Sequence, residues 1–138
     1  MIDINIEEII PHRDRMKLIQ EVLEADDEKA VTASVVNERW PLYSDNAVNP
    51  IVLIELVAQT AGIATGYKNK KETGKGVSGW LVGIKKADFF IDKILAGTRL
   101  ISQAKILYEH EAYGVFQGSV SSEAGKLAEM ELQLFRTG

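Results

Sequence analysis

Alternation of apolar and polar residues predicts that the second half of the chain is an antiparallel sheet. Between Lys126 and Phe135, the apolar Met130, Leu132 and Leu134 alternate with polar residues. This period is typical of a strand with one covered face and one wet face. The predicted strands are approximately Trp80 to Ile91, Thr98 to Glu109, Tyr113 to Ser121 and Lys126 to Phe135. The turns expected between the last three are at Gly114 and Ala124-Gly125.

The first 49 residues carry weaker signals. A short helix is predicted over Ile4 to Ile10, ended by Pro11. Two β-branched, apolar runs then predict a hairpin, with residues 26–28 as its acidic turn. Residues 37–49 have turn chemistry and no period, so we expect a loop there. The two runs are Met16 to Ala25 and Ala30 to Val36.

One segment predicts a long helix between the two groups of strands. Asn49 is a good helix cap and Pro50 is favoured at the first helical position. The segment that follows, IVLIELVAQTAGIATGY, has no consistent polar face, which predicts a helix enclosed by the rest of the protein. A lysine- and glycine-rich loop is expected over residues 68–79. One all-apolar helix crossing one antiparallel sheet predicts an α+β hot-dog fold, in which the sheet wraps around a long buried central helix.

Composition narrows the function classes. A chain of 138 residues is expected to form one domain, residues 1–138, with a core that needs no disulfide or metal. With 0 Cys and 2 His, thiolate chemistry and multi-histidine metal centres are not expected. The net charge of −4 gives no indication of nucleic-acid binding. The longest apolar stretch is interrupted by polar residues and the N-terminus is acidic, so we expect no membrane span and a cytoplasmic location.

The charge is unevenly distributed along the chain. Residues 1–50 carry 5 basic and 11 acidic side chains, whereas residues 51–100 carry 8 and 4. This basic excess follows the predicted central helix, where it would suit docking of a phosphate-bearing or acidic partner. A solvated loop kept polar for solubility is the alternative. The lysines concerned are Lys68, Lys70, Lys71, Lys75, Lys85 and Lys86.

Glu55 is the sharpest candidate for chemistry. It is a carboxyl group within a helix otherwise built for burial, and it lies beyond the free amides that a capping carboxylate serves. Desolvation raises the pKa of a buried carboxyl group, which suits general acid–base work near neutrality. Gln59, four residues on, shares its helix face. The alternative is that Glu55 points into a crevice and pairs with Arg13, Arg15 or a lysine.

The two histidines are weaker candidates. His12, in IPHRDRMKLI, lies just before the first predicted strand, where it either serves as a catalytic base or hydrogen-bonds to loop backbone. His110 lies in YEHEAY at a strand end, between two glutamates, and is expected to be solvated. Neither histidine has the spacing of a metal site or of a Ser/His/Asp triad.

Several segments resemble the β-hydroxyacyl-acyl carrier protein dehydratases. IPHRDRMKLIQEVLEAD is similar to the opening of that family, and VGIKKADFF and AGTRL are similar to a later strand and turn. NPIVLIELVAQTAG resembles the signature of the central helix, Glu-x-x-Ala-Gln-x-x-Gly. The resemblance implies a hot-dog dimer with an active-site tunnel at the subunit interface. It also implies an acyl thioester substrate carried on the phosphopantetheine of an acyl carrier protein or of CoA, with no cofactor.

The resemblance also implies roles for single residues. Glu55 matches the acid that protonates the departing 3-hydroxyl group. Ile51 matches the position whose backbone N–H polarises the thioester carbonyl, because Pro50 has no N–H. Apart from the resemblance, Gln59 is expected to bind substrate because it shares the helix face of Glu55, and Lys85 and Lys86 because they belong to the basic patch.

The chain departs from this family at one point. The family's catalytic histidine lies in a Gly-His-Phe-Pro-Gly segment, whereas the corresponding stretch here is WPLYSDNAVNP, which has no histidine. In this respect the chain resembles the ApeP-like proteins of aryl-polyene biosynthesis clusters. Those proteins act beside a second hot-dog subunit. Three hypotheses follow: a dehydratase whose base is His12 or a partner's histidine, a non-catalytic subunit of a homodimer or heterodimer, and an acyl-thioesterase.

Overall fold

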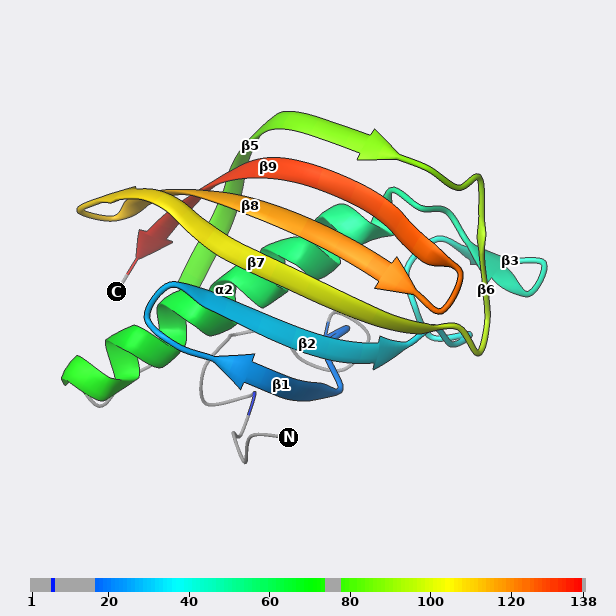
Figure 1. Cartoon of the computed structure of the whole chain (residues 1–138), viewed down its shortest axis with the longest axis horizontal. Helices are drawn as coiled ribbons and strands as arrows, with labels where there is room; N and C mark the ends of the chain where they lie inside the picture. The colour runs from blue at the N-terminus through cyan, green and yellow to red at the C-terminus, as the bar shows by residue number, and fades with distance from the viewer. Residues whose placement is uncertain (1–5, 7–16, 74–77, 138) are drawn as a thin grey trace.

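A six-stranded antiparallel sheet wraps across one long helix, as Figure 1 shows. The computed structural model describes residues 6, 17–73 and 78–137. The helix is α2, Val52–Thr73, and the strand order is β1-β2-β7-β8-β9-β5. The strands are β1 (Glu21–Ala25), β2 (Lys29–Val35), β5 (Ser78–Phe89), β7 (Arg99–His110), β8 (Tyr113–Ser122) and β9 (Gly125–Thr137). This arrangement confirms the predicted hot-dog fold.

Each predicted strand is present, with shifted ends. The run predicted from residue 16 becomes β1 only at Glu21, and residues 17–20 are not in a strand. The prediction of a turn at Gly114 is wrong, because Gly114 lies inside β8 and pairs with Leu134. The chain instead turns at Glu111, which adopts a φ of 53°. A Cβ atom at Gly114 would lie 2.8 Å from the ring of Phe116, so packing explains this glycine.

Helix α2 begins as the sequence predicts and ends later. The Asn49 side chain accepts a hydrogen bond from the Ile51 N–H at 3.0 Å, and the Asn49 carbonyl accepts one from Val52 at 3.1 Å. Asn49 is therefore the helix cap. The predicted loop over residues 68–79 is wrong in part, because α2 continues to Thr73 and β5 begins at Ser78. Lysines are good helix formers, so the lysine-rich segment continues the helix.

Two strands of a second, small sheet lie in the segment predicted to be a loop, residues 37–49. It consists of β3 (Tyr43–Ser44), β4 (Ala47–Val48) and β6 (Ile94–Leu95), in the order β3-β4-β6, beside the start of α2 (Figure 1). The turn between β3 and β4 has positive φ at Asp45 and Asn46, the residue types that tolerate this conformation best after glycine. Two-residue strands are too short to show alternation of apolar and polar residues. The pairing of β4 with β6 also cannot be predicted from the local sequence, because the two strands are far apart in the chain.

The core lies between the sheet and one face of α2. Leu53, Leu56, Thr60 and Ala64 have no exposed surface and recur at helical spacing along this face. A Cβ atom at Gly118 would lie 2.2 Å from Val57 Cγ1, so β8 needs a glycine where α2 crosses it.

Three buried hydroxyl groups meet within this core. Thr60 Oγ1 lies 3.0 Å from Thr32 Oγ1 on β2, 3.0 Å from Ser102 Oγ on β7 and 2.9 Å from the Leu56 carbonyl oxygen. A hydroxyl group has one proton and two acceptor lone pairs, so the Thr60 hydroxyl is fully used. The cluster ties the middle of α2 to two strands and fixes their register.

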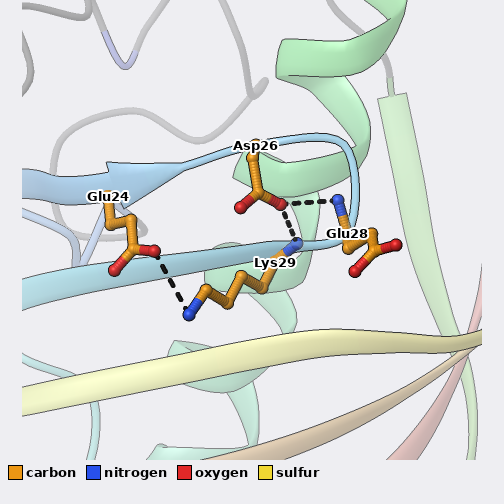
Figure 2. A network of polar contacts seen from close by, with 4 residues as sticks. All are labelled: Glu24, Asp26, Glu28 and Lys29. Atoms are coloured by element: carbon orange, nitrogen blue, oxygen red, sulfur yellow. Dashed lines mark hydrogen bonds and ion pairs between the residues drawn. The ribbon is translucent and has the colours of Figure 1, made fainter.

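The turn between β1 and β2 is held by an aspartate (Figure 2). Asp26 Oδ1 accepts hydrogen bonds from the N–H groups of Glu28 at 2.7 Å and Lys29 at 2.9 Å. These two bonds hold the pKa of Asp26 below its ordinary value, because they stabilise the ionised carboxylate. Beside them, Lys29 Nζ lies 3.2 Å from Glu24 Oε1. The acidic turn predicted over residues 26–28 is therefore confirmed.

The predicted N-terminal helix, Ile4 to Ile10, lies outside the described residues apart from Ile6, which is helical and buried. Among the described parts of the chain, no helix combines the length and the apolar character that a membrane span requires.

Candidate active site

The structure brings Glu55 and Gln59 into contact on α2. Gln59 Nε2 donates a hydrogen bond to Glu55 Oε1 over 3.1 Å. The Gln59 side chain is completely buried, whereas Glu55 is half-buried. Glu55 is thus a carboxyl group at the border between the core and the surface, with one oxygen bound by a buried amide.

A backbone group sets the orientation of the Gln59 amide. The Leu18 N–H donates a hydrogen bond to Gln59 Oε1 over 2.9 Å. Because a backbone N–H only donates, the oxygen of the Gln59 amide must face Leu18, and its NH₂ group must face Glu55. The segment leading into β1 therefore fixes which atom Glu55 meets.

Glu55 belongs to the face of α2 that points away from the buried contacts with the sheet. Glu55, Ala58 and Gly62 recur at helical spacing, and all three are only half-buried. We call Glu55, Ala58 and Gly62 the open face of α2. The expectation of a helix enclosed on all sides is wrong for this face of the single chain. Its residues are small or apolar apart from Glu55, so their composition alone did not separate an open face from a buried one.

Ile51 lies at the start of α2 with 52% of its surface exposed. Its backbone N–H, the group that the resemblance assigns to the thioester carbonyl, donates to the Asn49 side chain. A substrate carbonyl would have to replace or share that bond. The role of Ile51 stays a prediction.

Of the two histidines, His110 alone lies among the described residues. His12 lies outside the described residues, so its role stays a prediction as well. Residues 40–50, where the family histidine is missing, form the β3–β4 hairpin and its flanks, with Leu42 exposed in a left-handed conformation (φ 63°). His110 is exposed at the end of β7, 4.0 Å from Glu111.

The predicted lysine patch is divided between two elements, apart from Lys75, which lies outside the described residues. Lys85 and Lys86 lie on β5, where their ammonium groups are 3.6 Å from Glu131 and Asp88, respectively. Lys68 lies on α2, with Nζ 3.3 Å from Glu109 Oε1. Lys68, Lys85 and Lys86 thus have carboxylate neighbours, which reduce the local positive field. Exposed pairs of this kind contribute at most about 1 kcal/mol each. Binding of substrate or carrier by Lys85 and Lys86 stays a prediction.

A small cavity of about 30 Å³, which the sequence did not indicate, adjoins the open face. It lies between the second half of α2 and the β7–β8 hairpin. Gly62 and Thr65 form its helix side, Phe116 and Leu134 are among its apolar walls, and Glu109 is among its polar residues. Only the small residues of α2 hint at such a space in the sequence.

Comparisons with known proteins agree with this fold. The model of the ApeP-like family, described as ApeP dehydratase, matches residues 4–138. A 3-hydroxyacyl-(acyl-carrier-protein) dehydratase FabZ from Streptococcus sanguinis is 33% identical over 144 residues, covering 100% of this chain and 99% of the relative. The same enzyme from Streptococcus equi subsp. zooepidemicus is 32% identical over 134 residues, covering 93% and 92%.

Solved structures share the fold. The dehydratase heterocomplex ApeI:P from Xenorhabdus doucetiae contains a chain that superposes with a TM-score of 0.90 at 21% identity, covering 98% of this chain and 92% of that one. A hypothetical thioesterase with coenzyme A from Streptococcus pneumoniae has a TM-score of 0.64 at 14% identity, covering 86% and 85%. At these identities the likeness shows the fold alone.

The family model and the dehydratase relatives cover nearly the whole chain, including the Glu55 helix. This chain belongs to the ApeP-like dehydratases, a hot-dog family related to the 3-hydroxyacyl-acyl-carrier-protein dehydratases. Its function is dehydratase-like.

Proposed function

We propose that this chain is a working dehydratase subunit in which Glu55 is the general acid for a 3-hydroxyacyl thioester. The observation that carries the proposal is the chain of contacts from the Leu18 N–H through the Gln59 amide to Glu55 Oε1. These contacts hold the half-buried Glu55 carboxyl group in a defined orientation on α2. The family membership supplies the reaction class.

The proposed reaction is an elimination of water. A base removes a proton from C2 of the acyl chain, the C2–C3 double bond forms, and the C3–O bond breaks. The hydroxyl group leaves as water after taking the proton of the Glu55 carboxyl group, and Glu55 is left as a carboxylate. The proton taken by the base returns to Glu55 through solvent. We propose His12 or a histidine of a partner as the base, and acyl carrier protein or CoA as the carrier, with no cofactor.

The open face of α2 supports a partner subunit. A half-exposed carboxyl group with small neighbours is a poor place for chemistry until water is excluded from it. One edge of the sheet also favours a partner: β5 has 12 residues, including exposed Ile84 and Phe89, and no described strand pairs with its outer side. The opposite edge, β1, has only 5 residues, and its register is irregular. Long apolar edges favour pairing with another chain.

We propose a second hot-dog subunit as this partner, in a homodimer or a heterodimer. The covered open face would then form the active site between the two chains. A cytoplasmic pathway of the fatty-acid or aryl-polyene kind is the proposed setting, in keeping with the family.

A second candidate is a non-catalytic subunit that completes the site of a catalytic partner. The loop that carries the family histidine is here the β3–β4 hairpin region, residues 40–50, and it has none. In this case Glu55 would be a structural residue of the interface.

Exchange of Glu55 for glutamine separates these two candidates. Glu55→Gln keeps an oxygen for the Gln59 amide but removes the transferable proton. If Glu55 is the acid, dehydration of a 3-hydroxyacyl thioester should fall about 10²–10⁴-fold. The assay follows enoyl thioester absorbance, for the chain alone and with a candidate hot-dog partner.

Glu72→Gln is the matched control, since Glu72 is an exposed carboxylate on the same helix. It should leave turnover unchanged. Activity that needs this chain but is indifferent to Glu55→Gln would favour the non-catalytic subunit. Full turnover by the partner without this chain would contradict both candidates.

A further inference from the structure

We propose that the outer face of the six-stranded sheet, the face turned away from α2, binds a second copy of this chain back to back. Helix α2, which carries Glu55, lies on the other side of the sheet (Figure 1). The inference therefore goes beyond the proposed function and does not depend on it. In the described part of the chain, no helix or strand covers this outer face (Figure 1).

The outer face carries aromatic side chains near the β7–β8 hairpin. Tyr113 and Phe135 are direct partners in the register of β8 and β9. They lie three residues from the buried Phe116 and Leu132, respectively, so strand alternation places them on the opposite, outer face. The ring of Tyr108 lies 6.5 Å from that of Tyr113, edge to face. We call Tyr108, Tyr113 and Phe135 the aromatic patch. Exposed apolar surface gathered in one place marks an interaction site.

A row of polar residues crosses the same face. Four residues on neighbouring strands are successive partners in the sheet register: Lys29 (β2), Lys105 (β7), Gln117 (β8) and Glu131 (β9). Direct partners project from one face of a sheet. Gln117 is exposed and follows the buried Phe116, so this face is the outer one. One half of the row is therefore basic and the other acidic, with an uncharged glutamine between them.

Lys105 lacks an acidic neighbour within this chain. Its side chain is exposed, and it forms no ion pair with any described residue. Its register partner is another lysine, Lys29, which is paired with Glu24 at 3.2 Å. Like charges directly opposite each other in a sheet repel, so an anion from another molecule would stabilise Lys105. Glu131 of a second copy can supply it and keep its contact with Lys85, because a carboxylate accepts several hydrogen bonds.

A two-fold axis that runs along β8, between the two copies, makes the outer face complementary to itself. Rotation about this axis exchanges β7 and β9. Lys105 of each copy then faces Glu131 of the other copy, and Gln117 faces its own counterpart. Positions along the strands are unchanged, so the two aromatic patches meet as well. A contact of this isologous kind closes on itself and gives a defined assembly.

The outer face is large enough for a stable contact. Five strands spaced about 4.8 Å apart, each about ten residues long at roughly 3.3 Å per residue, span roughly 800 Å². A standard interface buries about 800 Å² on each partner. The row of charges also favours a second copy over a membrane or a nucleic acid, because those surfaces require basic residues alone.

Exchange of charges tests the proposed geometry. The unit is the full chain with any hot-dog partner that copurifies, and its mass is measured by light scattering after size exclusion. Lys105→Glu places carboxylates against each other and should halve the wild-type mass, and so should Glu131→Lys. The double variant restores both ion pairs and should recover the full mass. Lys93→Glu is the control, because it reverses an exposed lysine beside β6 in the small sheet, and it should leave the mass unchanged.

The aromatic patch is tested by its central residue. Tyr113→Ala removes a ring from the proposed contact and should raise the dissociation constant between units at least about tenfold. Circular dichroism checks that each variant keeps the fold.

Single cysteines test which residues meet. The sequence has 0 Cys, so an introduced cysteine is the only thiol of the chain. Gln117→Cys lies beside the proposed axis, where a short bismaleimide should join two copies. Lys29→Cys lies in the same row but two strands away, so its counterpart would be roughly 20 Å distant and should not be joined.

The outcomes separate association from its geometry. A wild-type mass equal to one unit at every soluble concentration would overturn the proposal. A double variant that stays dissociated like the single variants, or equal cross-linking of Gln117→Cys and Lys29→Cys, would overturn the two-fold arrangement along β8. None of these results bears on Glu55, whose role is tested by turnover.

Discussion

The two faces of α2 differ in almost every physical respect. The sheet-facing side has Leu53, Leu56 and Thr60 without exposed surface, and the Thr60 hydroxyl group is satisfied by buried partners. The open face has a carboxyl group, an alanine and a glycine, all only half-buried. The sheet-facing side packs in the core of this chain, whereas the open face contacts solvent or another molecule.

This difference separates stability from function along a single helix. Substitutions on the sheet-facing side should change the free energy of unfolding, since burial there is complete. Substitutions on the open face should change activity or binding and leave folding nearly intact. The predictions that follow test whether the two faces are as independent as their surroundings indicate.

The largest effect is expected for Leu53→Ala on the sheet-facing side. Removal of a fully buried leucine side chain should lower the free energy of unfolding by about 2–5 kcal/mol, because it leaves a cavity. Ile51→Ala, at an exposed position two residues away, should cost about 0.5 kcal/mol or less. Urea unfolding at low protein concentration measures both. Equal losses would contradict the difference between buried and exposed positions of α2. An Ile51→Ala loss that grows with protein concentration would show that a second copy covers Ile51.

A glycine pair tests the close approach of α2 to the sheet. Gly118→Ala places a Cβ atom 2.2 Å from Val57 Cγ1, so the helix must shift, at a cost of about 1–3 kcal/mol. Gly83→Ala places one 2.4 Å from Gln133 Oε1, the far end of a flexible side chain that can move away. Thermal unfolding should therefore show a clear loss for Gly118→Ala and a small change for Gly83→Ala. A neutral Gly118→Ala would mean that α2 is not held tightly against β8.

The buried hydroxyl cluster offers a smaller effect. Thr60→Val has nearly the same shape but removes the central hydroxyl group, so it should cost about 1 kcal/mol. Adding Thr32→Val and Ser102→Ala removes the partners as well, and the triple variant should recover part of the loss. Chemical denaturation of the single and triple variants measures this coupling. Additive losses would contradict a shared network.

The smallest effect is expected in the exposed β1–β2 turn, far from both faces of α2. The two backbone hydrogen bonds lower the pKa of Asp26 in the folded chain. The stability they add is present above the unfolded pKa of about 4 and is lost as the pH falls through the lower folded value. Asp26→Asn keeps the acceptor oxygen but should flatten this part of the pH profile, which thermal unfolding between pH 6 and pH 3 measures. A variant with the unchanged wild-type profile would show that Asp26 does not titrate as described.

Much of the fold follows from local pattern. The alternation of Met130, Leu132 and Leu134 identifies β9, and Asn49-Pro50 marks the start of α2, because strand period and helix capping depend on neighbours in the chain. The β3–β4–β6 sheet does not follow, because two-residue strands become visible only through a partner some 50 residues away. The extension of α2 to Thr73 was missed because lysine and threonine occur in loops as readily as in exposed helix ends.

The candidate site also has some features that follow from the sequence and others that depend on the tertiary structure. The sequence by itself determined that a carboxyl group lies in an apolar helix with a glutamine one turn later, because both facts depend only on spacing. The tertiary structure alone decided that the Leu18 N–H orients the Gln59 amide, that the face with Glu55 is left open, and that a cavity follows it. These features arise from contacts between segments distant in sequence, and their geometry depends on how the sheet packs across the helix.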